Sequence, residues 1–573
     1  MSWTQHLILA PILLPMVVAG LMLVIDGRSG RTTAALGVFS TFALLFIAIV
    51  LLVQASAGGA QSAVQVYQIG NWPSRLGIVL ALDRLSAMML ALTALLATAA
   101  MVFSLARWHK AGSFFHPLFQ VLLVGLNGAF LTGDLFNLFV FFEIMLAASY
   151  GLALHGSGHA RVKAGLHYIA VNLVASSAFL IGVSLIYGAT GSLNMADIAS
   201  RIGDLDAHGA MLFRVGAAVL GVAFLVKAAI WPLGFWLPTT YAAAGPPVAA
   251  MFAIMTKVGV YAILRLGLLF SPDGQSNVLA ASGLLLTGGV ITIIYGMLGM
   301  LASQAMARLA GFSVLVSSGT LLAVMGAGNA NVFSATLYYL VSSTLAIAAF
   351  FMLIELAERG RARADDVLAV TLEAYGIVYD EDSEDSREAG AAVPAILAIL
   401  GIAFMACALL LSGLPPLSGF IAKFAMLDAL LDQARNGPAP GSAWAAWLLV
   451  ATLVVSGLAT LIAMMRAGIR TFWPSFEREA PRVSMIELGP VLVLLALCVG
   501  LTIQAGPAMR FVRHTTEQLA ERKLYMDAVL KKPVVAPQAS AAEASASPAG
   551  VPGAQAPVTP PPKPPPPKKE ASR

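Results

Sequence analysis

Four ionisable residues stand inside long apolar stretches of the sequence. Glu143 lies in the middle of the run DLFNLFVFFEIMLAASYGLAL, which covers 134–154. Three lysines lie in separate apolar runs further along the chain: Lys227, Lys257 and Lys423. A charged side chain at the centre of a bilayer costs roughly 2.5 to 3.5 kcal/mol on insertion scales, and such residues mark ion or proton pathways. The sequence therefore predicts a proton or ion relay built from these four residues.

Glu143 and Lys227 are expected to form the pair at the centre of this relay. Burial disfavours the charged form of both residue types, so each can take up or release a proton near neutral pH. Bringing the two together restores both charges, and lysine suits such a switch better than arginine, which stays protonated. A permanent salt bridge that holds two helices together is the structural alternative for this pair.

The composition indicates the kind of protein that must position these residues. The 573 residues are 59% hydrophobic and only 11% charged, whereas a soluble domain carries about 25% charged residues. Only helices and closed barrels satisfy their backbone in lipid, and the short alternating segments of a barrel are absent from the sequence. We therefore predict an all-α polytopic membrane protein. About fourteen spans are expected, at 5–25, 32–54, 78–106, 113–131, 133–154, 164–187, 209–231, 247–270, 277–300, 304–327, 330–356, 392–434 (interrupted after 412), 442–467 and 485–507.

Basic residues in the loops predict the orientation of the spans. They follow the first, third, fifth, eleventh and thirteenth spans: Arg28, Arg31, Arg107, Lys110, Arg161, Lys163, Arg359, Arg361, Arg363, Arg466, Arg470, Arg478 and Arg482. The positive-inside rule places these loops in the cytoplasm and both termini outside. The basic segment after Ile503 conflicts with this orientation, although the rule has little force at a late C-terminus.

Prolines interrupt the span that carries Lys227. Pro232 follows this lysine by five residues, and because proline cannot donate a hydrogen bond, it frees the carbonyl of Ala228. Pro238 follows in the same segment. A proline kink without function is the alternative.

A second interruption precedes Lys423. The segment GLPPLSG (413–419) contains Pro415 and Pro416 inside an apolar run. Interrupted helices at corresponding positions of two halves indicate a transport site. Spans seven and twelve are five apart, which suggests that spans 4–8 are repeated in spans 9–13. The correspondence is imperfect, because Lys227 precedes its interruption whereas Lys423 follows its own.

Other residues give weaker signals. His167, in GLHYIAVNL, could relay a proton between Glu143 or Lys227 and the cytoplasm, and a core histidine is an equal alternative. Asp83 and Arg84 suit the start of span three. No metal site is expected from the spacing of the histidines, and no phosphate-binding or nucleophile motif occurs.

Two domains are expected. Residues 1–510 form the transmembrane domain, and 511–573 form a tail that is first amphipathic and then rich in proline, alanine and lysine. The acidic segment EAYGIVYDEDSEDSREAG (373–390) is expected to be a solvated loop or a docking surface for a partner subunit.

Several motifs carry a resemblance to a known family. They read LTGDLFNLFVFFEIMLAASYGL, GSLNMADI, FLVKAAIWPLGFWLPTTYAAAGPPVAA, GLPPLSGFIAKF and LDRLSAMML. Over roughly residues 1–510 the sequence resembles the D subunit of Mrp-type multisubunit monovalent cation/proton antiporters. The wider proton-conducting family includes membrane-arm subunits of respiratory complex I, but LFNLFVFFEIML and LNMADI favour the Mrp D subunit, nearest the Pha-type systems of proteobacteria.

The resemblance implies an architecture and roles for the four residues. It implies fourteen helices with two inverted five-helix repeats (spans 4–8 and 9–13) and broken helices seven and twelve. Glu143 and Lys227 would form the gating ion pair, Lys257 the central relay and Lys423 the exit of the second half. The family also implies assembly with A, B, C, E, F and G subunits, no cofactor, and the bacterial inner membrane.

The second half of the sequence departs from the family pattern. Many relatives carry a histidine near Ser342 and a lysine at the place of Ile347. Lys423 therefore stands almost alone there. Hydroxyl groups with water could bridge this gap, although hydroxyl-rich helix packing explains them equally well: Ser317, Ser318, Ser342, Ser343, Tyr338 and Tyr339.

These observations predict a transporter subunit and not an enzyme. We expect a proton-driven exporter of Na⁺ or K⁺ that serves pH homeostasis. The alternatives are the proton-pumping arm of a quinone oxidoreductase or membrane hydrogenase, and a scaffold that has lost transport.

Overall fold

The computed structural model describes most of the chain. It covers residues 6–25, 30–57, 64–112, 114–271, 279, 282–327, 330–375, 395–436, 440–472 and 483–530. The acidic segment from 376 onward and the proline-rich tail from 531 onward therefore lie outside the described residues.

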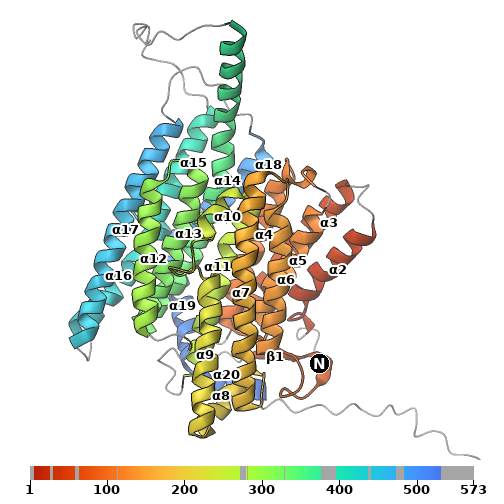
Figure 1. Ribbon diagram of the computed structural model, residues 1–573, viewed down its shortest axis with the longest axis vertical. Coiled ribbons are helices and arrows are strands. Elements are labelled where there is room, and N and C mark those ends of the chain that lie inside the picture. Colours follow the sequence, from red (N-terminus) through yellow and green to blue (C-terminus); the bar gives the residue numbers. More distant parts are fainter. Residues whose placement is uncertain are drawn as a thin grey trace, which may run out of the picture. The chain divides into compact units, whose positions relative to one another are not determined.

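Apolar helices make up almost all of the described chain (Figure 1). Twelve are long and apolar enough to cross a membrane: α3 Gly30–Ser56, α4 Arg84–Ser104, α6 Leu135–Ala153, α7 His159–Thr190, α9 Ala207–Lys227, α11 Pro246–Leu269, α12 Ser282–Ala302, α13 Met306–Gly326, α14 Ala330–Tyr375, α15 Ala395–Ser412, α17 Pro440–Phe472 and α18 Met485–Ile503. The shorter apolar helices α2 Ala10–Val24 and α5 Phe115–Leu131 complete the fourteen predicted spans. The prediction of an all-α polytopic membrane protein is confirmed.

The remaining elements continue spans or connect them. Two of them continue interrupted spans: α10 Leu237–Ala243 and α16 Ser418–Asn436. The others lie in connections or after the last span: the antiparallel strands β1 Gln65–Gln68 and β2 Val79–Leu82, the 3-10 turns η2 Ile69–Asn71, η3 Trp108–Lys110 and η4 Ile202–Asp204, and the helices α8 Met195–Arg201, α19 Ala505–Ala520 and α20 Arg522–Leu530. The predicted domain boundary at 510 lies inside α19.

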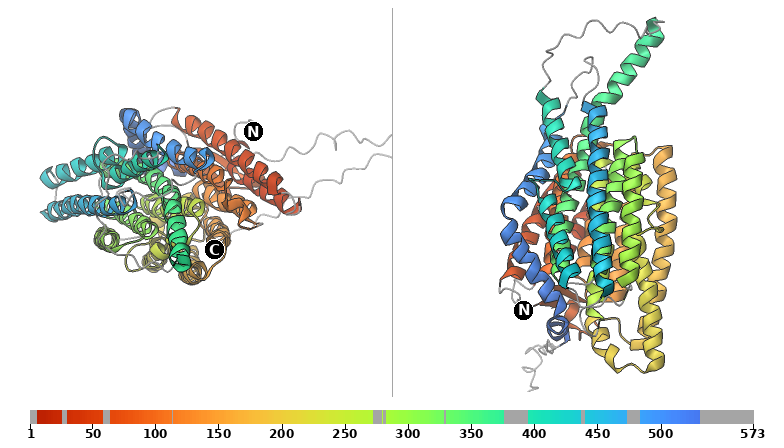
Figure 2. Two further views of the ribbon diagram at one scale, coloured as in Figure 1. Left: turned by 90° about the horizontal axis from the view of Figure 1, so that it is seen from above. Right: turned by 90° about the vertical axis from the view of Figure 1, so that its left-hand side faces the viewer.

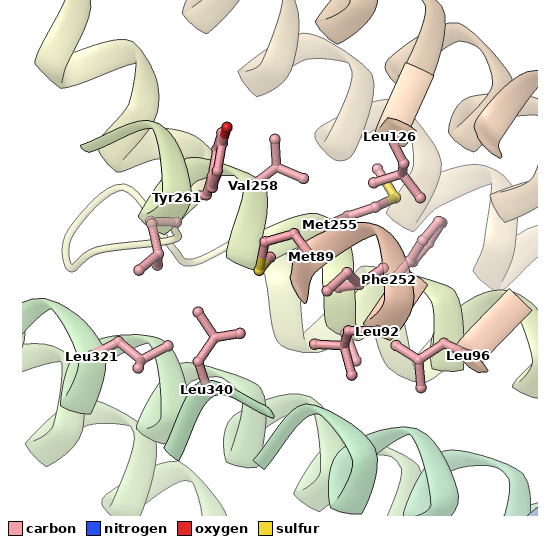
Figure 3. Close-up of a cluster of buried hydrophobic side chains, with 14 of the residues drawn as sticks. Met89, Leu92, Leu96, Leu126, Phe252, Met255, Val258, Tyr261, Leu321 and Leu340 are labelled. Atoms are coloured by element: carbon pink, nitrogen blue, oxygen red, sulfur yellow. The ribbon is translucent and has the colours of Figure 1, made fainter. Parts of the chain in front are cut away.

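Burial separates central helices from peripheral ones. The apolar window of α11 is buried along its whole length, and α4, α13 and α14 bury at least 89% of theirs, whereas α3, α7, α15, α17 and α18 bury 39% or less. Seen along the bundle, α2 and α3 lie at one edge and α16 and α17 at the opposite edge (Figure 2). Side chains from α4, α5, α11, α13 and α14 gather in one apolar cluster (Figure 3). The lysine of α11 is therefore carried by the most enclosed helix.

The two ends of the bundle carry different elements. At one end Arg107 is 3.3 Å from Glu355, Arg359 is 2.7 Å from Glu487, and Arg161 stacks over Trp108. The opposite end carries α8, α20 and β1 (Figure 1), and α20 contacts both of the other elements. Basic residues after the third, fifth and eleventh spans thus share one end, as the predicted orientation requires.

Both interruptions fall at the fourth helix of a predicted five-helix repeat. The first repeat contains α5, α6, α7, the pair α9 and α10, and α11. The second contains α12, α13, α14, the pair α15 and α16, and α17. In each repeat one span is thus built from two shorter helices.

Gly259 allows α11 to approach the end of α9 closely. A Cβ atom at this position would lie 2.7 Å from both the Ala228 nitrogen and the Phe224 oxygen, which are backbone atoms. Small residues at such crossings let membrane helices pack at short range. The position beside Lys227 therefore depends on a glycine in the neighbouring helix.

We predict that Gly259→Ala lowers the melting temperature of the purified assembly by several degrees. Overpacking costs about 1–3 kcal/mol, and here backbone atoms must move. The matched control is Gly489→Ala in α18, where a Cβ meets open space. Melting is followed by size-exclusion chromatography after heating. Equal melting temperatures for the two variants would contradict the close-approach role of Gly259.

Candidate functional site

Lys227 is the last residue of α9. Beyond it the chain leaves the helix through Ala229, whose φ is +58°, and α10 begins at Leu237 with Pro238 in its first turn. The helix thus ends five residues before Pro232. A helix C-terminus carries partial negative charge, which favours a cation at this position.

The hydrogen-bond partner of Lys227 is an amide. Its Nζ donates to Oδ1 of Asn172 at 2.8 Å, and the Asn172 side chain is fully buried in α7. Asn172 Nδ2 donates to the Tyr168 carbonyl at 2.7 Å, and the Tyr168 hydroxyl lies 2.8 Å from Ser149 Oγ in α6. Sequence reasoning missed Asn172, although a lone amide in an apolar span was an available signal.

Glu143 is half-buried on α6 and forms no ion pair within 4.0 Å among the described residues. Its Oε1 atom is buried and has no hydrogen-bond partner among those residues. Val140 and Ala147, on the same face of α6, are exposed. The predicted pair therefore makes no direct ion pair or hydrogen bond in the described part of the chain, and Asn172 holds the ammonium group.

Lys257 lies in the middle of α11 and is completely buried. Its Nζ donates to Ser317 Oγ at 2.9 Å and lies 3.5 Å from Ser318 Oγ, both in α13. Ser317 Oγ donates to Ser343 Oγ in α14 at 3.1 Å. Two serines thus connect the central lysine with α14.

Lys423 reaches back to the end of the preceding helix. Its Nζ donates to the carbonyls of Ser412 at 2.9 Å and Leu411 at 3.3 Å, in the last turn of α15. Gly413 has φ +77°, and a Cβ there would lie 2.4 Å from Lys423 Cδ. The glycine thus gives the lysine its route to helix-end carbonyls.

Pro415 and Pro416 separate α15 from α16, which begins at Ser418. Ser418 Oγ lies 2.8 Å from Ser342 Oγ in α14. This contact brings the second interruption next to the hydroxyl-bearing face of α14. The two lysines differ in their relation to the breaks: Lys227 is the last residue of α9, whereas Lys423 follows its break and bonds back to the end of α15.

Two of the weaker candidates lie elsewhere. His167 is exposed, and its Nδ1 lies 2.9 Å from the Lys163 carbonyl in its own helix. The Tyr338 hydroxyl donates to the Leu501 carbonyl in α18 at 2.9 Å. Neither residue joins the polar contacts around the lysines. Ser317 does, and Ser342 contacts Ser418 at the second interruption.

A separate charged pair, Asp83 and Arg265, lies near the C-terminal end of α11. Arg265 donates to Asp83 through both terminal nitrogens, at 2.5 and 2.7 Å, and Asp83 caps α4 through Ser86. Burial by itself would raise the pKa of Asp83, but the charge and hydrogen bonds of Arg265 hold that pKa below its usual value. The Arg265 guanidinium stacks over the rings of Tyr261 and Tyr525, at 5.5 and 5.4 Å from their centroids. This pair is a structural lock, and sequence reasoning missed Arg265.

Comparisons with known proteins identify the family. The family model described as NADH:quinone oxidoreductase/Mrp antiporter, TM, matches residues 132–437. A protein of Rhizobium meliloti, named as the D subunit of a probable K⁺/H⁺ antiporter, is 57% identical over 542 residues, which cover 94% of this chain and all of that protein. The D subunit of the Na⁺/H⁺ antiporter of Bacillus subtilis is 30% identical over 538 residues, covering 92% of this chain and all of that one.

Solved structures share the fold. A chain of the Mrp complex from Dietzia sp. DQ12-45-1b has a TM-score of 0.77 and 26% identity, covering 92% of this chain and all of that chain. A chain of respiratory complex I from Thermus thermophilus has a TM-score of 0.69 at 22% identity, covering 90% and 99%, which shows the fold alone. The chain belongs to the NADH:quinone oxidoreductase/Mrp antiporter family. Within that family it is of the Mrp D-subunit type, so the resemblance seen in the motifs is confirmed.

We predict that Asn172→Leu destabilises the assembly because it leaves the Lys227 ammonium without its acceptor. Loss of one partner of a buried charged hydrogen bond costs about 1.5–3 kcal/mol. The melting temperature should fall in Asn172→Leu and recover in the double variant with Lys227→Met. Ser184→Ala, an exposed position on the same helix whose hydroxyl bonds only within α7, is the control. A double variant as unstable as the single one would show that the bond is not the cause.

Proposed function

We propose that this chain is the proton-conducting subunit of a multisubunit monovalent cation/proton antiporter in the bacterial inner membrane. The observation that carries the proposal is the set of three buried lysines, each hydrogen-bonded to neutral groups, on α9, α11 and α16. The relatives named as D subunits of antiporters support antiport as the activity. The chain is then a secondary transporter subunit and not an enzyme.

The proton path runs from the first repeat to the second through the buried lysines and their hydroxyl partners. Glu143 and Lys227 form the gate. Asn172 holds the Lys227 ammonium group whenever the Glu143 carboxylate is not paired with it. Lys257 continues the path toward the serines of α13 and α14. Neutral partners suit this task, because they allow a lysine to lose its proton without leaving a paired charge behind.

Hydroxyl groups take over where the second half lacks titratable residues. Ser317 accepts from Lys257 and donates to Ser343, and a hydroxyl can accept on one side while it donates on the other. Ser342, next to Ser343 on α14, leads to Ser418 and the second interruption. Water bridging Ser343 to Ser342, and Ser418 to Lys423, would complete the path.

The exported ion is Na⁺ or K⁺, and the 57% identical relative, named as part of a probable K⁺/H⁺ antiporter, favours potassium. The proposed partners are subunits of the A, B, C, E, F and G types. Exposed apolar side chains on α7 and α17 give the bundle faces for lipid or neighbouring subunits. No cofactor enters the proposal.

Glu143→Gln and Lys227→Met should each lower cation-dependent proton release by about 100-fold, the scale of positioned acid–base groups. The measurement is dye-reported ΔpH in everted vesicles from cells that express the whole operon, with assembly checked on native gels. Glu517→Gln, an exposed carboxylate on α19, is the control. Assembled variants that exchange at the wild-type rate would refute the proposal and leave the scaffold alternative.

Ser317→Ala and Ser343→Ala should slow exchange by about tenfold or more, because each removes a hydroxyl that both accepts and donates. Ser313→Ala is the matched control, since that buried serine bonds only to the Ala310 carbonyl of its own helix. Wild-type exchange in both test variants would exclude the serine path.

A proton-pumping arm of a redox complex is the alternative function. Transport measured in vesicles without an electron donor distinguishes antiport from redox-driven proton pumping. Exchange driven by an imposed cation gradient supports antiport, whereas proton movement that requires electron transfer supports the alternative.

A further inference from the structure

An apolar groove of about 400 Å³ opens between α3, α4, α14, α18 and α19, away from the lysine path. Leu52, Ala91, Val341 and Phe511 are among its lining side chains. Its volume falls in the range of about 300–1,000 Å³ that is usual for ligand pockets. The groove is therefore large enough for a hydrocarbon ligand.

The polar lining residues have their hydroxyls engaged within the protein. The Tyr338 hydroxyl donates to the Leu501 carbonyl at 2.9 Å, and Ser56 Oγ donates to the Leu52 carbonyl at 2.6 Å. The Ser56 carbonyl in turn accepts from Arg84 Nη2 at 2.7 Å. The groove thus suits an apolar chain, because a polar ligand would find its partners already occupied.

The groove fits within one leaflet. It begins at Ser56, the last residue of α3, and its lining on α4 runs from Met88 to Leu95. Over those residues a helix rises about 10 Å, which is less than half of the roughly 30 Å hydrocarbon core. Val53, at the rim, is 64% exposed, so the groove is open toward the surrounding lipid.

Basic side chains predominate at the surface end of the groove. Arg84 stacks over the Phe511 ring at 5.5 Å, and α19 exposes Arg510 and Arg513 beside the lining residues Phe511 and Val512. One carboxylate of the same helix, Glu517, lies 3.8 Å from Arg513. A helix with apolar residues toward the protein and basic residues outward is typical of the membrane interface. The geometry points to a bound anionic phospholipid, with one acyl chain in this groove and its phosphate at Arg510 and Arg513.

The lipid has a structural consequence for α14. The acyl chain packs against Tyr338 and Val341 of α14, and Ser342 of the hydroxyl path is the next residue along this helix. The acyl chain fills the space between α4 and α14 and excludes water from it. The site stands independently of the transported ion, so failure of the antiport proposal would not remove it.

The test uses the purified assembled complex in nanodiscs of phosphatidylethanolamine and phosphatidylglycerol. The probe is phosphatidylglycerol with a photoactivatable group in its acyl chain, and labelled peptides are mapped by mass spectrometry. We expect labelling within 88–95 and 338–341. Labelling there by a phosphatidylcholine analogue to the same extent would overturn the anionic preference. Absence of label from both segments, or cross-linking of a partner helix in the groove, would overturn the site.

Two variants sharpen the result. Ala91→Trp fills the groove and should lower labelling at 338–341 at least tenfold, whereas Leu284→Trp, on the lipid-facing side of α12, should not. Arg510→Gln with Arg513→Gln should abolish the preference for phosphatidylglycerol, and Arg214→Gln, an exposed arginine on α9, should leave it unchanged. Unchanged labelling in Ala91→Trp, or an unchanged preference in the arginine double variant, would contradict the proposal. The labelling pattern of the wild-type complex tests the site even if a variant fails to fold.

Discussion

The architecture of the described chain has to place three lysine ammonium groups in an apolar interior without a carboxylate bonded to any of them. Lys227, Lys257 and Lys423 bond to an amide oxygen, a serine hydroxyl and helix-end carbonyls, respectively. A buried carboxylate within bonding distance would hold each proton in place, because breaking such a pair leaves an uncompensated charge. Neutral dipoles solvate the ammonium form and remain satisfied by the amine form. Under the proposed function, these are the three sites at which a proton is taken up and released.

The interruptions of the helices supply part of this solvation. The carbonyls in the middle of a continuous helix are already bonded within the helix, whereas a helix that ends inside the bundle leaves its last carbonyls without a helical partner. Lys423 uses two such carbonyls, and Gly413 leaves room for its methylenes. Lys227 stands at a helix end itself. Prolines at the breaks and glycines beside the lysines are thus parts of one arrangement.

The sequence predicted the span count, the helix interruptions and the family, because bilayer thickness and backbone chemistry act on each segment separately. Contacts between segments were harder to predict. Asn172 replaced Glu143 as the bonding partner of Lys227, since that choice depends on how α6, α7 and α9 are rotated about their axes. His167 lies on the outer face of α7 for the same reason. The hydrogen bonds of Lys423 to the end of α15 could not be predicted, because Lys423 follows the break in the sequence.

The Asp83 and Arg265 pair, covered by the Tyr525 ring, also bears on biogenesis. Its two charges come from α4 and α11, whereas the ring that covers the guanidinium comes from α20, after the final span. Ser74 and Val529 add a hydrogen bond of 2.7 Å in the same region. A chain that ended before α19 would contain every spanning helix and still leave one side of this guanidinium uncovered. The native surroundings of this pair are therefore complete only when the segment after the last span is in place.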